Sequence, residues 1–202
     1  VRKAMELIFP ELAEKTKHIP HGMLRLPTGK MSSRTGDVIT AKWMLEYVKD
    51  PIKFKINTGN FATRDEKGRR DQSPGRVDDN VERLSQKIAV GAIKYAILRQ
   101  KLGQDIVFQL ENFTSFEGDS GPYLQYTHAR ANSVIEKAKK ENIQASVKKI
   151  PEQVGDVERL LERFPETVAR AYTELEPHYI TTYLTQLAGA FNAFYARERI
   201  TD

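Results

Sequence analysis

From residue 78 onward, apolar residues recur at every third or fourth position, a spacing that is typical of amphipathic helices. Gly103 follows the first of these stretches, and prolines stand at the start of later ones, as expected for residues that end and begin helices. The spacing predicts helices over residues 78–100, 122–140, 154–164, 165–175 and 177–194. The chain is therefore expected to be mainly α, with a helical bundle as its largest part.

The first quarter of the chain has a different pattern. A short amphipathic piece lies around Pro10, and residues 21–26 alternate between polar and apolar as a strand does. A helix capped by Asp37 or Thr40 is expected to stop at Pro51. The stretch after it is polar and contains glycine, which indicates a connector. We thus expect three parts, covering residues 1–52, a basic connector over 53–77, and a helical domain over 78–202.

Composition excludes several classes of protein. With 202 residues, of which 40% are apolar, the chain can bury a core. No apolar run approaches the roughly 18 residues that a membrane span needs, so no membrane association is expected. The absence of cysteine removes disulfides, thiol nucleophiles and thiolate zinc sites, and four histidines leave little for another metal cluster. We therefore expect no protein metal site and a cytoplasmic location.

The net charge of +5 hides an asymmetry between the two halves. Residues 1–101 carry 21 Lys and Arg against 12 Asp and Glu, a balance of +9, whereas residues 102–202 carry 11 against 15, a balance of −4. A basic half attracts polyanions at long range, so nucleic acid or nucleotide phosphates are plausible partners. The alternative is solvated charge that serves solubility.

A loop over residues 27–36 combines a proline, two glycines and four hydroxyl side chains around Lys30. A lysine on such a loop can follow a polyphosphate whose charge shifts during a reaction, because its ammonium is a point charge on a flexible stem. The spacing does not match a P-loop, since no hydroxyl residue directly follows the lysine. The alternative is an ordinary polar surface loop.

Two segments resemble known proteins. The KMSKS signature loop of class I aminoacyl-tRNA synthetases is similar to Gly29-Lys30-Met31-Ser32-Ser33-Arg34. The start of the anticodon-binding domain of arginyl-tRNA synthetases resembles the segment Ser115–Arg130, SFEGDSGPYLQYTHAR. This family resemblance implies that residues 1–52 are the end of an α/β class I catalytic domain, and that residues 78–202 are most of the anticodon-binding bundle.

The family reaction, as the resemblance implies, joins arginine to ATP and passes the arginyl group to tRNA(Arg). ATP would bring Mg²⁺ as its counter-ion, and the full enzyme would be monomeric. Lys30 matches the first signature lysine and would stabilise charge on the departing pyrophosphate in the transition state, with Ser32 and Ser33 donating hydrogen bonds. Ser33 stands where these enzymes usually have a second lysine, for which Arg34 is a substitute.

A second candidate site lies on the helix that Pro122 opens. Tyr123 and Arg130 are two helical turns apart, so they share a face with Thr127 between them and Lys137 two turns further on. A tyrosine can stack on an unpaired base and an arginine can bind phosphate, which is how proteins bind single-stranded loops. Tyr123 and Arg130 also match the family's anticodon-contacting positions. The alternatives are a buried tyrosine and an interhelical salt bridge from the arginine.

Four neighbouring residues extend this candidate RNA surface. Gln125 and Tyr126 would widen the patch or simply pack. Near the C-terminus, the segment Phe191–Arg199 is similar to the helix that leads to a second anticodon-contacting loop, so Tyr195 and Arg199 are further candidates. Core packing for the tyrosine and solvated charge for the arginine are the alternatives.

One further segment resembles a catalytic motif but is not counted as one. The segment His18–Gly22 superficially resembles the class I HIGH motif, but Pro20 replaces the small glycine and a strand-like stretch follows it. We expect the chain to be a fragment without this half of the phosphate-binding machinery, and inactive alone. Other functional hypotheses are a stand-alone helical RNA-binding module without catalysis and a plain helical scaffold.

Overall fold

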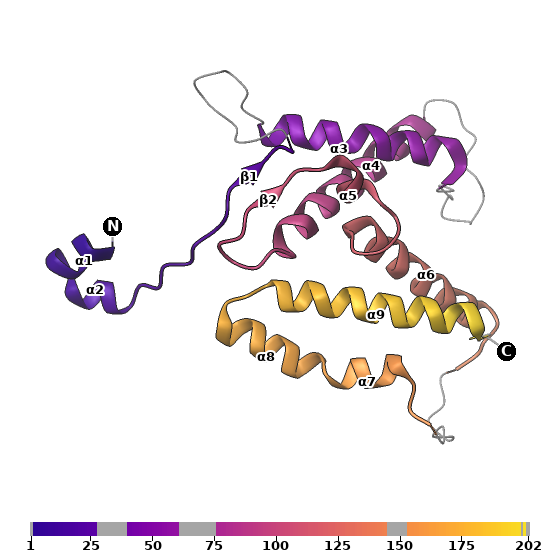
Figure 1. Ribbon diagram of the computed structural model, residues 1–202. Coiled ribbons are helices and arrows are strands. Elements are labelled where there is room, and N and C mark those ends of the chain that lie inside the picture. Colours follow the sequence, from indigo (N-terminus) through magenta and orange to yellow (C-terminus); the bar gives the residue numbers. More distant parts are fainter. Residues whose placement is uncertain (1, 28–39, 61–75, 145–152, 199, 201–202) are drawn as a thin grey trace.

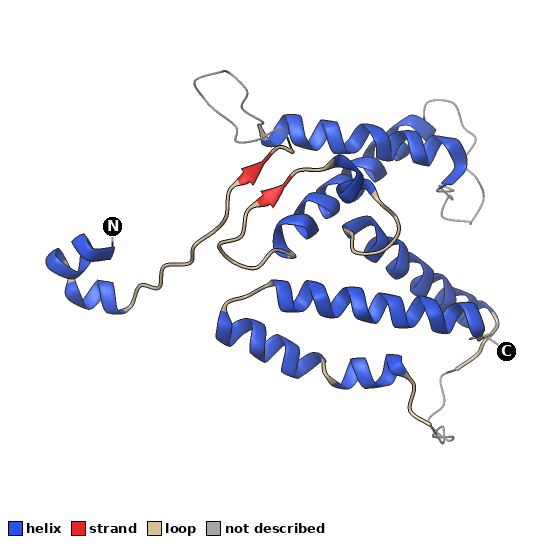
Figure 2. Ribbon diagram, in the orientation of Figure 1, coloured by secondary structure: helices blue, strands red, loops and turns tan. Residues whose placement is uncertain are grey.

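The computed structural model describes residues 2–27, 40–60, 76–144, 153–198 and 200. Apart from two short strands, the regular elements in these ranges are helical, which confirms the mainly α expectation (Figures 1 and 2). Their bounds are α1 (Arg2–Ile8), α2 (Pro10–Glu14), β1 (Leu24–Arg25), α3 (Ala41–Lys55), the π-helix η1 (Ile56–Asn60), α4 (Arg76–Leu98), β2 (Ile106–Val107), α5 (Leu110–Thr114), α6 (Gly121–Lys140), α7 (Asp156–Glu162), α8 (Phe164–Glu174) and α9 (His178–Arg197).

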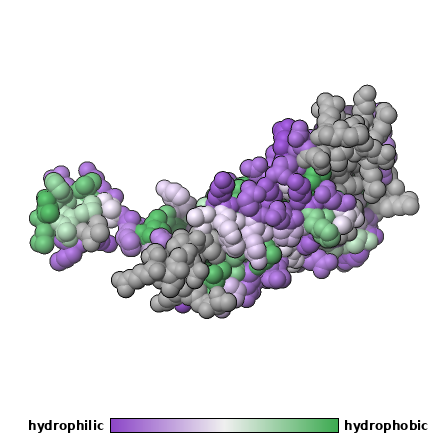
Figure 3. Space-filling model, turned by 90° about the horizontal axis from the view of Figure 1, so that it is seen from above, coloured by the Kyte–Doolittle hydropathy of each residue, from purple (hydrophilic) through white to green (hydrophobic). Residues whose placement is uncertain are grey.

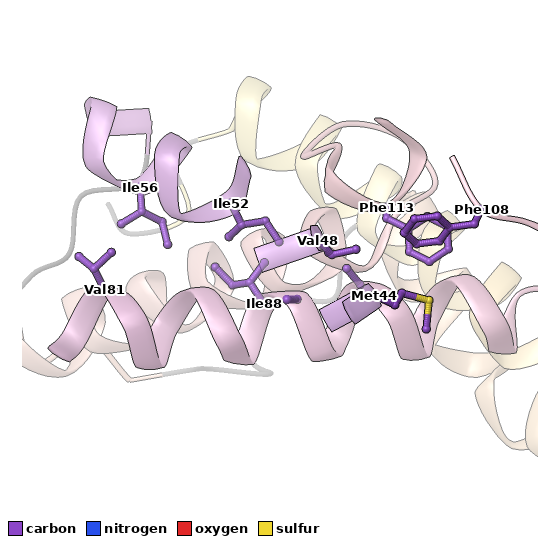
Figure 4. Close-up of a cluster of buried hydrophobic side chains, with 10 residues drawn as sticks. Met44, Val48, Ile52, Ile56, Val81, Ile88, Phe108 and Phe113 are labelled. Carbon is purple, nitrogen blue, oxygen red and sulfur yellow. The ribbon is translucent and has the colours of Figure 1, made fainter. Parts of the chain in front are cut away.

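The main hydrophobic core lies between α3 and α4. Figure 4 shows Val48, Ile52 and Ile56 of the α3–η1 segment pointing toward Val81 and Ile88 of α4. Phe108 and Phe113 of the β2–α5 segment close the same cluster, with ring centroids 4.7 Å apart. Burying side chains of this size contributes about 1.5–3 kcal/mol each, so this cluster fixes α3 against α4.

Helix α3 differs from the sequence expectation at its C-terminal end. Thr40 is the N-cap, and its Oγ1 accepts a hydrogen bond from Trp43 N at 3.1 Å. The helix does not stop at Pro51 but continues through it to Lys55. A proline inside a helix costs about 3 kcal/mol. Burial of Ile52 and Ile56, at 0% and 4% exposure, is of the size needed to offset that cost.

Two short strands join the N-terminal part of the chain to the segment after α4. Strands β1 and β2 pair in parallel, with Leu24 opposite Ile106. Asp105 supports the pair, because its carboxylate accepts from Met23 N at 2.8 Å and forms an ion pair with Arg25. Residues 82 positions apart in sequence are thereby held side by side (Figure 1).

The C-terminal helices build outward from α4. Helix α6 packs on α4, α9 packs on α6, and α7 and α8 pack on α9 (Figure 1). The contact between α4 and α6 depends on Gly121, where an added Cβ would lie 2.7 Å from Gly91 O and 2.8 Å from Ala92 Cα. This close approach brings the start of α6 directly against α4.

Helices α1 and α2 pack against each other and stand apart from the other helices (Figure 1). The apolar side chains of Leu7, Ile8 and Leu12 in these helices, and of Phe9 between them, are exposed. Figure 3 shows this hydrophobic surface in green at one end of the molecule. Within the described ranges, no helix is both long enough and apolar enough to cross a membrane.

Candidate nucleic-acid interface

A cleft of about 660 Å³ lies where α6 and α9 meet the end of α3 and the loop before α6. We call it the α6–α9 cleft. Its lining combines three aromatic side chains with charged and amide groups, namely Lys55, Ser115, Phe116, Glu117, Tyr123, Tyr126, Arg130 and Asn192. These residues come from four separate parts of the sequence, which the fold brings together.

Arg130 is held between two tyrosine rings. Its guanidinium carbon lies 4.6 Å from the ring centroid of Tyr126 and 4.8 Å from that of Tyr195. Its Nη2 donates a hydrogen bond to the Tyr126 hydroxyl, and its Nη1 donates to Asn192 Oδ1 at 2.6 Å. No carboxylate among the described residues lies within ion-pair distance of Arg130. The interhelical salt bridge considered above is therefore not formed there, and the partners of the guanidinium in the cleft are neutral groups.

Asn192 of α9 organises the polar wall of the cleft. Its Nδ2 donates to the Tyr123 hydroxyl at 3.0 Å and to Thr127 Oγ1 at 2.8 Å, while its Oδ1 accepts from Arg130. Both amide hydrogens are thereby used. Thr127 is buried, and its hydroxyl donates to Tyr123 O at 2.9 Å. One amide of α9 therefore orients three side chains of α6.

The loop between α5 and α6 is held by side-chain to backbone hydrogen bonds. Ser120 is the N-cap of α6, accepting from Tyr123 N at 3.1 Å and donating to Ser115 O at 2.6 Å. Ser115 Oγ accepts from Glu117 N and donates to Glu117 O. Gly118 has φ of +70°, a conformation that other residues rarely adopt. The loop side of the cleft thus has a defined shape.

A second polar cluster fixes the far end of this loop. The Tyr95 hydroxyl of α4 donates to the Asp119 carboxylate and lies 2.5 Å from Thr185 Oγ1 of α9. Arg99 forms an ion pair with the same carboxylate. Burial, followed by the hydrogen bond to Asp119, raises the pKa of Tyr95 to about 12. This cluster ties α4, the loop and α9 together behind the α6–α9 cleft.

Lys55, the last residue of α3, reaches the cleft from the opposite side. Its Nζ donates to Thr114 O at 2.9 Å and lies 5.2 Å from the centroid of the Phe116 ring. The described residues offer Lys55 no carboxylate partner. The cleft therefore contains two such cations on opposite elements, with aromatic rings beside each.

The structure brings four of the predicted RNA-binding residues together. Tyr123 and Tyr126 line the cleft with Arg130, and Tyr195 is 41% exposed with its ring against Arg130. Tyr123 is half-buried, and its hydroxyl accepts from Asn192. Exposed aromatic faces next to a guanidinium are what proteins use to bind unpaired bases and the phosphates between them.

Three other predicted residues lie elsewhere. Thr127 is 7% exposed and lies beneath the cleft, so it is not on the exposed face as predicted. Its hydroxyl accepts from Asn192 and thereby helps to position that side chain. Gln125 points to α4, where its Nε2 donates to Lys87 O at 3.3 Å. Lys137 is exposed in the last turn of α6, and its Nζ lies 3.9 Å from the Glu141 carboxylate.

The remaining predicted residues lie outside the described part of the chain. They are the whole signature loop, Gly29, Lys30, Met31, Ser32, Ser33 and Arg34, together with Arg199. In the described ranges, no group of three or more His, Asp or Glu side chains has the arrangement of a metal site.

Sequence reasoning missed five of the eight residues that line the cleft, namely Lys55, Ser115, Phe116, Glu117 and Asn192. Asn192 lies in the segment that resembled the family and is one helical turn before Tyr195, so its position was a usable signal. Ser115, Phe116 and Glu117 lie in the other quoted segment. Lys55 is nearly 70 residues before Tyr123 and carried no sequence signal, because α3 was expected to end before it.

Comparisons of the sequence and of the structure with known proteins both find similarity to arginine–tRNA ligases. Residues 124–202 match the DALR anticodon binding domain family. The chain is 33% identical over 205 residues to the arginine–tRNA ligase of Pyrococcus furiosus, covering 96% of this chain and 31% of that protein. It is 32% identical over 205 residues to the arginine–tRNA ligase of Clostridium perfringens, covering 100% of this chain and 34% of that one.

A solved structure also matches. Thermus thermophilus arginyl-tRNA synthetase superposes with a TM-score of 0.72 at 29% sequence identity, covering 99% of this chain and 31% of that one. The chain thus spans about a third of the length of the relatives that it matches.

Proposed function

We propose that this chain, a homologue of arginine–tRNA ligases with a DALR anticodon binding domain in residues 124–202, is part of such a ligase and binds the anticodon loop of tRNA(Arg) in the α6–α9 cleft. On this proposal the whole enzyme uses ATP to activate arginine and transfers the arginyl group to the tRNA. It acts as a monomer in the cytoplasm.

The observation that carries the proposal is the set of neighbours around the Arg130 guanidinium. Its guanidinium lies between the rings of Tyr126 and Tyr195 and is oriented by the neutral amide of Asn192. A guanidinium that served the fold alone would gain most from a carboxylate partner, and none is within ion-pair distance among the described residues. This arrangement suits an anionic ligand with flat groups, which describes a single-stranded RNA loop.

The side chains of the cleft would contact different parts of a nucleotide, according to their chemistry. Tyr126 is 38% exposed, so its ring can stack on a base. Arg130 would then contact polar groups of the same nucleotide. The Tyr123 hydroxyl accepts from Asn192, so its own proton would be the one donated to a base edge or a phosphate. Stacking and hydrogen bonding together would select unpaired nucleotides over a duplex.

The catalytic part of the proposal concerns the N-terminal quarter of the chain. On the resemblance, residues 1–52 complete the catalytic domain, residues 53–77 connect, and residues 78–202 bind the anticodon. Lys30 would stabilise the charge that develops on pyrophosphate as arginyl-adenylate forms, with Ser32 and Ser33 as hydrogen-bond donors. ATP would arrive with Mg²⁺ held by its own phosphates.

The binding proposal is tested with the chain and a fluorescent anticodon stem-loop of tRNA(Arg). We expect saturable binding that weakens steeply with salt and weakens further when the anticodon bases are exchanged for those of another tRNA. Equal affinity for both stem-loops would contradict anticodon recognition and would favour a module that binds RNA without sequence preference.

The catalytic proposal is tested in the complete ligase. Lys30→Ala should slow pyrophosphate exchange by at least about a hundredfold while tRNA affinity stays within a few-fold, because the lost charge acts mainly on the transition state. Equal exchange rates for variant and parent would contradict the role given to Lys30.

A further inference from the structure

Three lysines near the C-terminal end of α3 have different surroundings. Lys49 Nζ lies 2.6 Å from Glu46 and 2.7 Å from Glu82, and Lys53 Nζ lies 2.9 Å from the same Glu82. These two side chains are therefore neutralised by carboxylates of α3 and α4. Lys55, two residues further along the same helix, has a carbonyl and an aromatic ring as neighbours instead.

The contacts of Lys55 hold its ammonium at the cleft without removing its charge. Within the described part of the chain, one of its three hydrogens goes to Thr114 O at 2.9 Å, which leaves two donors for a ligand. Phe116, 5.2 Å away, attracts the cation by its ring face but does not neutralise it. The side chain of Lys55 is therefore restrained, while its ammonium charge stays available for a ligand.

The charge balance of the α6–α9 cleft depends on this residue. Among the residues that the structure describes, the charged members of its lining are Lys55, Arg130 and Glu117. With Lys55 the lining has two cations and one anion, and without it Arg130 and Glu117 would cancel. The sign of the charge that the cleft presents to a polyanion is thus set by a residue from the basic N-terminal half of the chain.

We propose that Lys55 binds a backbone phosphate of the RNA loop whose bases contact the α6–α9 side of the cleft. This inference rests on the proposed function and adds to it a contact from outside residues 124–202, the part that matches the anticodon-binding family. A lysine ammonium suits this role because it is a compact, non-directional charge that binds phosphate without regard to the neighbouring base. Lys55 then contributes affinity and salt dependence, whereas Tyr126 and Arg130 contribute selection of bases.

The test compares Lys55→Met with Lys53→Met, which removes the same charge from the same helix but from an ion pair with Glu82. Binding of the fluorescent anticodon stem-loop is measured from about 50 to about 200 mM salt. We expect Lys55→Met to weaken binding by about three- to tenfold at the lower salt and to reduce the slope of log K against log salt by about 0.7. Lys53→Met should stay within about twofold of the parent with an unchanged slope, because Glu82 already offsets that charge.

Two further variants separate a phosphate contact from a structural effect. Lys55→Arg keeps the charge and should restore the parental slope. A loop with one exchanged anticodon base should lose the same factor of affinity with Lys55→Met as with the parent, since the phosphate contact carries no base information. A larger loss for one base than another would overturn the assignment to phosphate.

The outcomes distinguish this inference from the proposed function. A parental slope for Lys55→Met, or an equal loss for Lys55→Met and Lys53→Met, overturns the role of Lys55. If Arg130→Met weakens binding in the same series, the α6–α9 cleft remains the RNA site and only the Lys55 contact is wrong. If Arg130→Met also binds as the parent does, the proposed function itself fails.

Discussion

The α3–α4 interface and the α6–α9 cleft both contain cations, but they hold them in opposite ways. Between α3 and α4, Glu82 accepts from Lys49 and Lys53, so charge is cancelled where helices meet. In the cleft, Arg130 is held by tyrosine rings and by the neutral amide of Asn192. Cancelled charge serves the fold, whereas charge that is positioned by neutral groups remains available for a ligand.

Arg130→Met gives the largest effect expected from this comparison. The variant keeps an unbranched, flexible stem but removes the guanidinium between Tyr126 and Tyr195. Affinity for the anticodon stem-loop should fall by about 10- to 100-fold, as for loss of one or two hydrogen bonds to a charged group. The measurement is the dissociation constant by fluorescence titration, and a change below about twofold would remove the distinction between the two regions.

Asn192→Ala should have a smaller effect on binding and a clear one on stability. Tyr123, Thr127 and Arg130 all lose their partner on α9 in this variant. We expect affinity to fall by up to about tenfold and the free energy of unfolding to fall by about 1–3 kcal/mol. Asn132→Ala, at an exposed position of α6, is the matched control and should change neither. Parental affinity for Asn192→Ala would show that Arg130 needs no orienting amide.

Tyr95→Phe tests the cluster behind the loop by its pH dependence. The pKa of Tyr95 is raised to about 12 in the folded protein from its ordinary value of 10.0. The contribution of the neutral hydroxyl is therefore complete below about pH 10 and is lost as the pH rises toward 12. Melting temperatures of the parent should fall more steeply over this window than those of Tyr95→Phe, with Tyr172→Phe as an exposed control. Parallel curves would contradict the raised pKa.

Glu82→Gln should have the smallest effect on RNA binding and a distinctive effect at acid pH. Hydrogen bonds from Lys49 and then Lys53 lower the pKa of Glu82, so its stabilising contribution is present above the ordinary value near 4.5 and is lost as the pH falls through the lowered pKa. The difference in melting temperature between parent and variant should shrink as the pH falls below about 4. Stem-loop affinity near neutral pH should stay within about twofold, and a tenfold loss would mean that the α3–α4 cations also bind RNA.

Much of the fold and three of the eight residues that line the cleft could be predicted from local sequence. Ser120 and Pro122 mark the start of α6, and the seven-residue spacing of Tyr123 and Arg130 places both on one face. Periodicity does not give the rotation of that face relative to other helices. Gln125 therefore turned out to contact Lys87 of α4, and Thr127 lies beneath the cleft.

The parts that could not be predicted depend on tertiary packing. A proline at position 51 predicted the end of a helix, but burial of Ile52 against α4 carries α3 on to Lys55. The contact of Asn192 with α6 joins residues 62 to 69 positions apart, and no local pattern specifies such a pairing. Both facts belong to packing between elements and not to propensity within one.

Photo-crosslinking of the bound RNA tests the central claim most directly. An anticodon stem-loop with a photoreactive nucleotide in its loop is irradiated in complex with the parent chain, and the attached peptides are identified by mass spectrometry. The account predicts crosslinks within α6 near Tyr123, Tyr126 and Arg130, and within α9 near Tyr195, all of them lost on competition with unlabelled stem-loop. Competed crosslinks on α7 or α8, with none on α6, would contradict it.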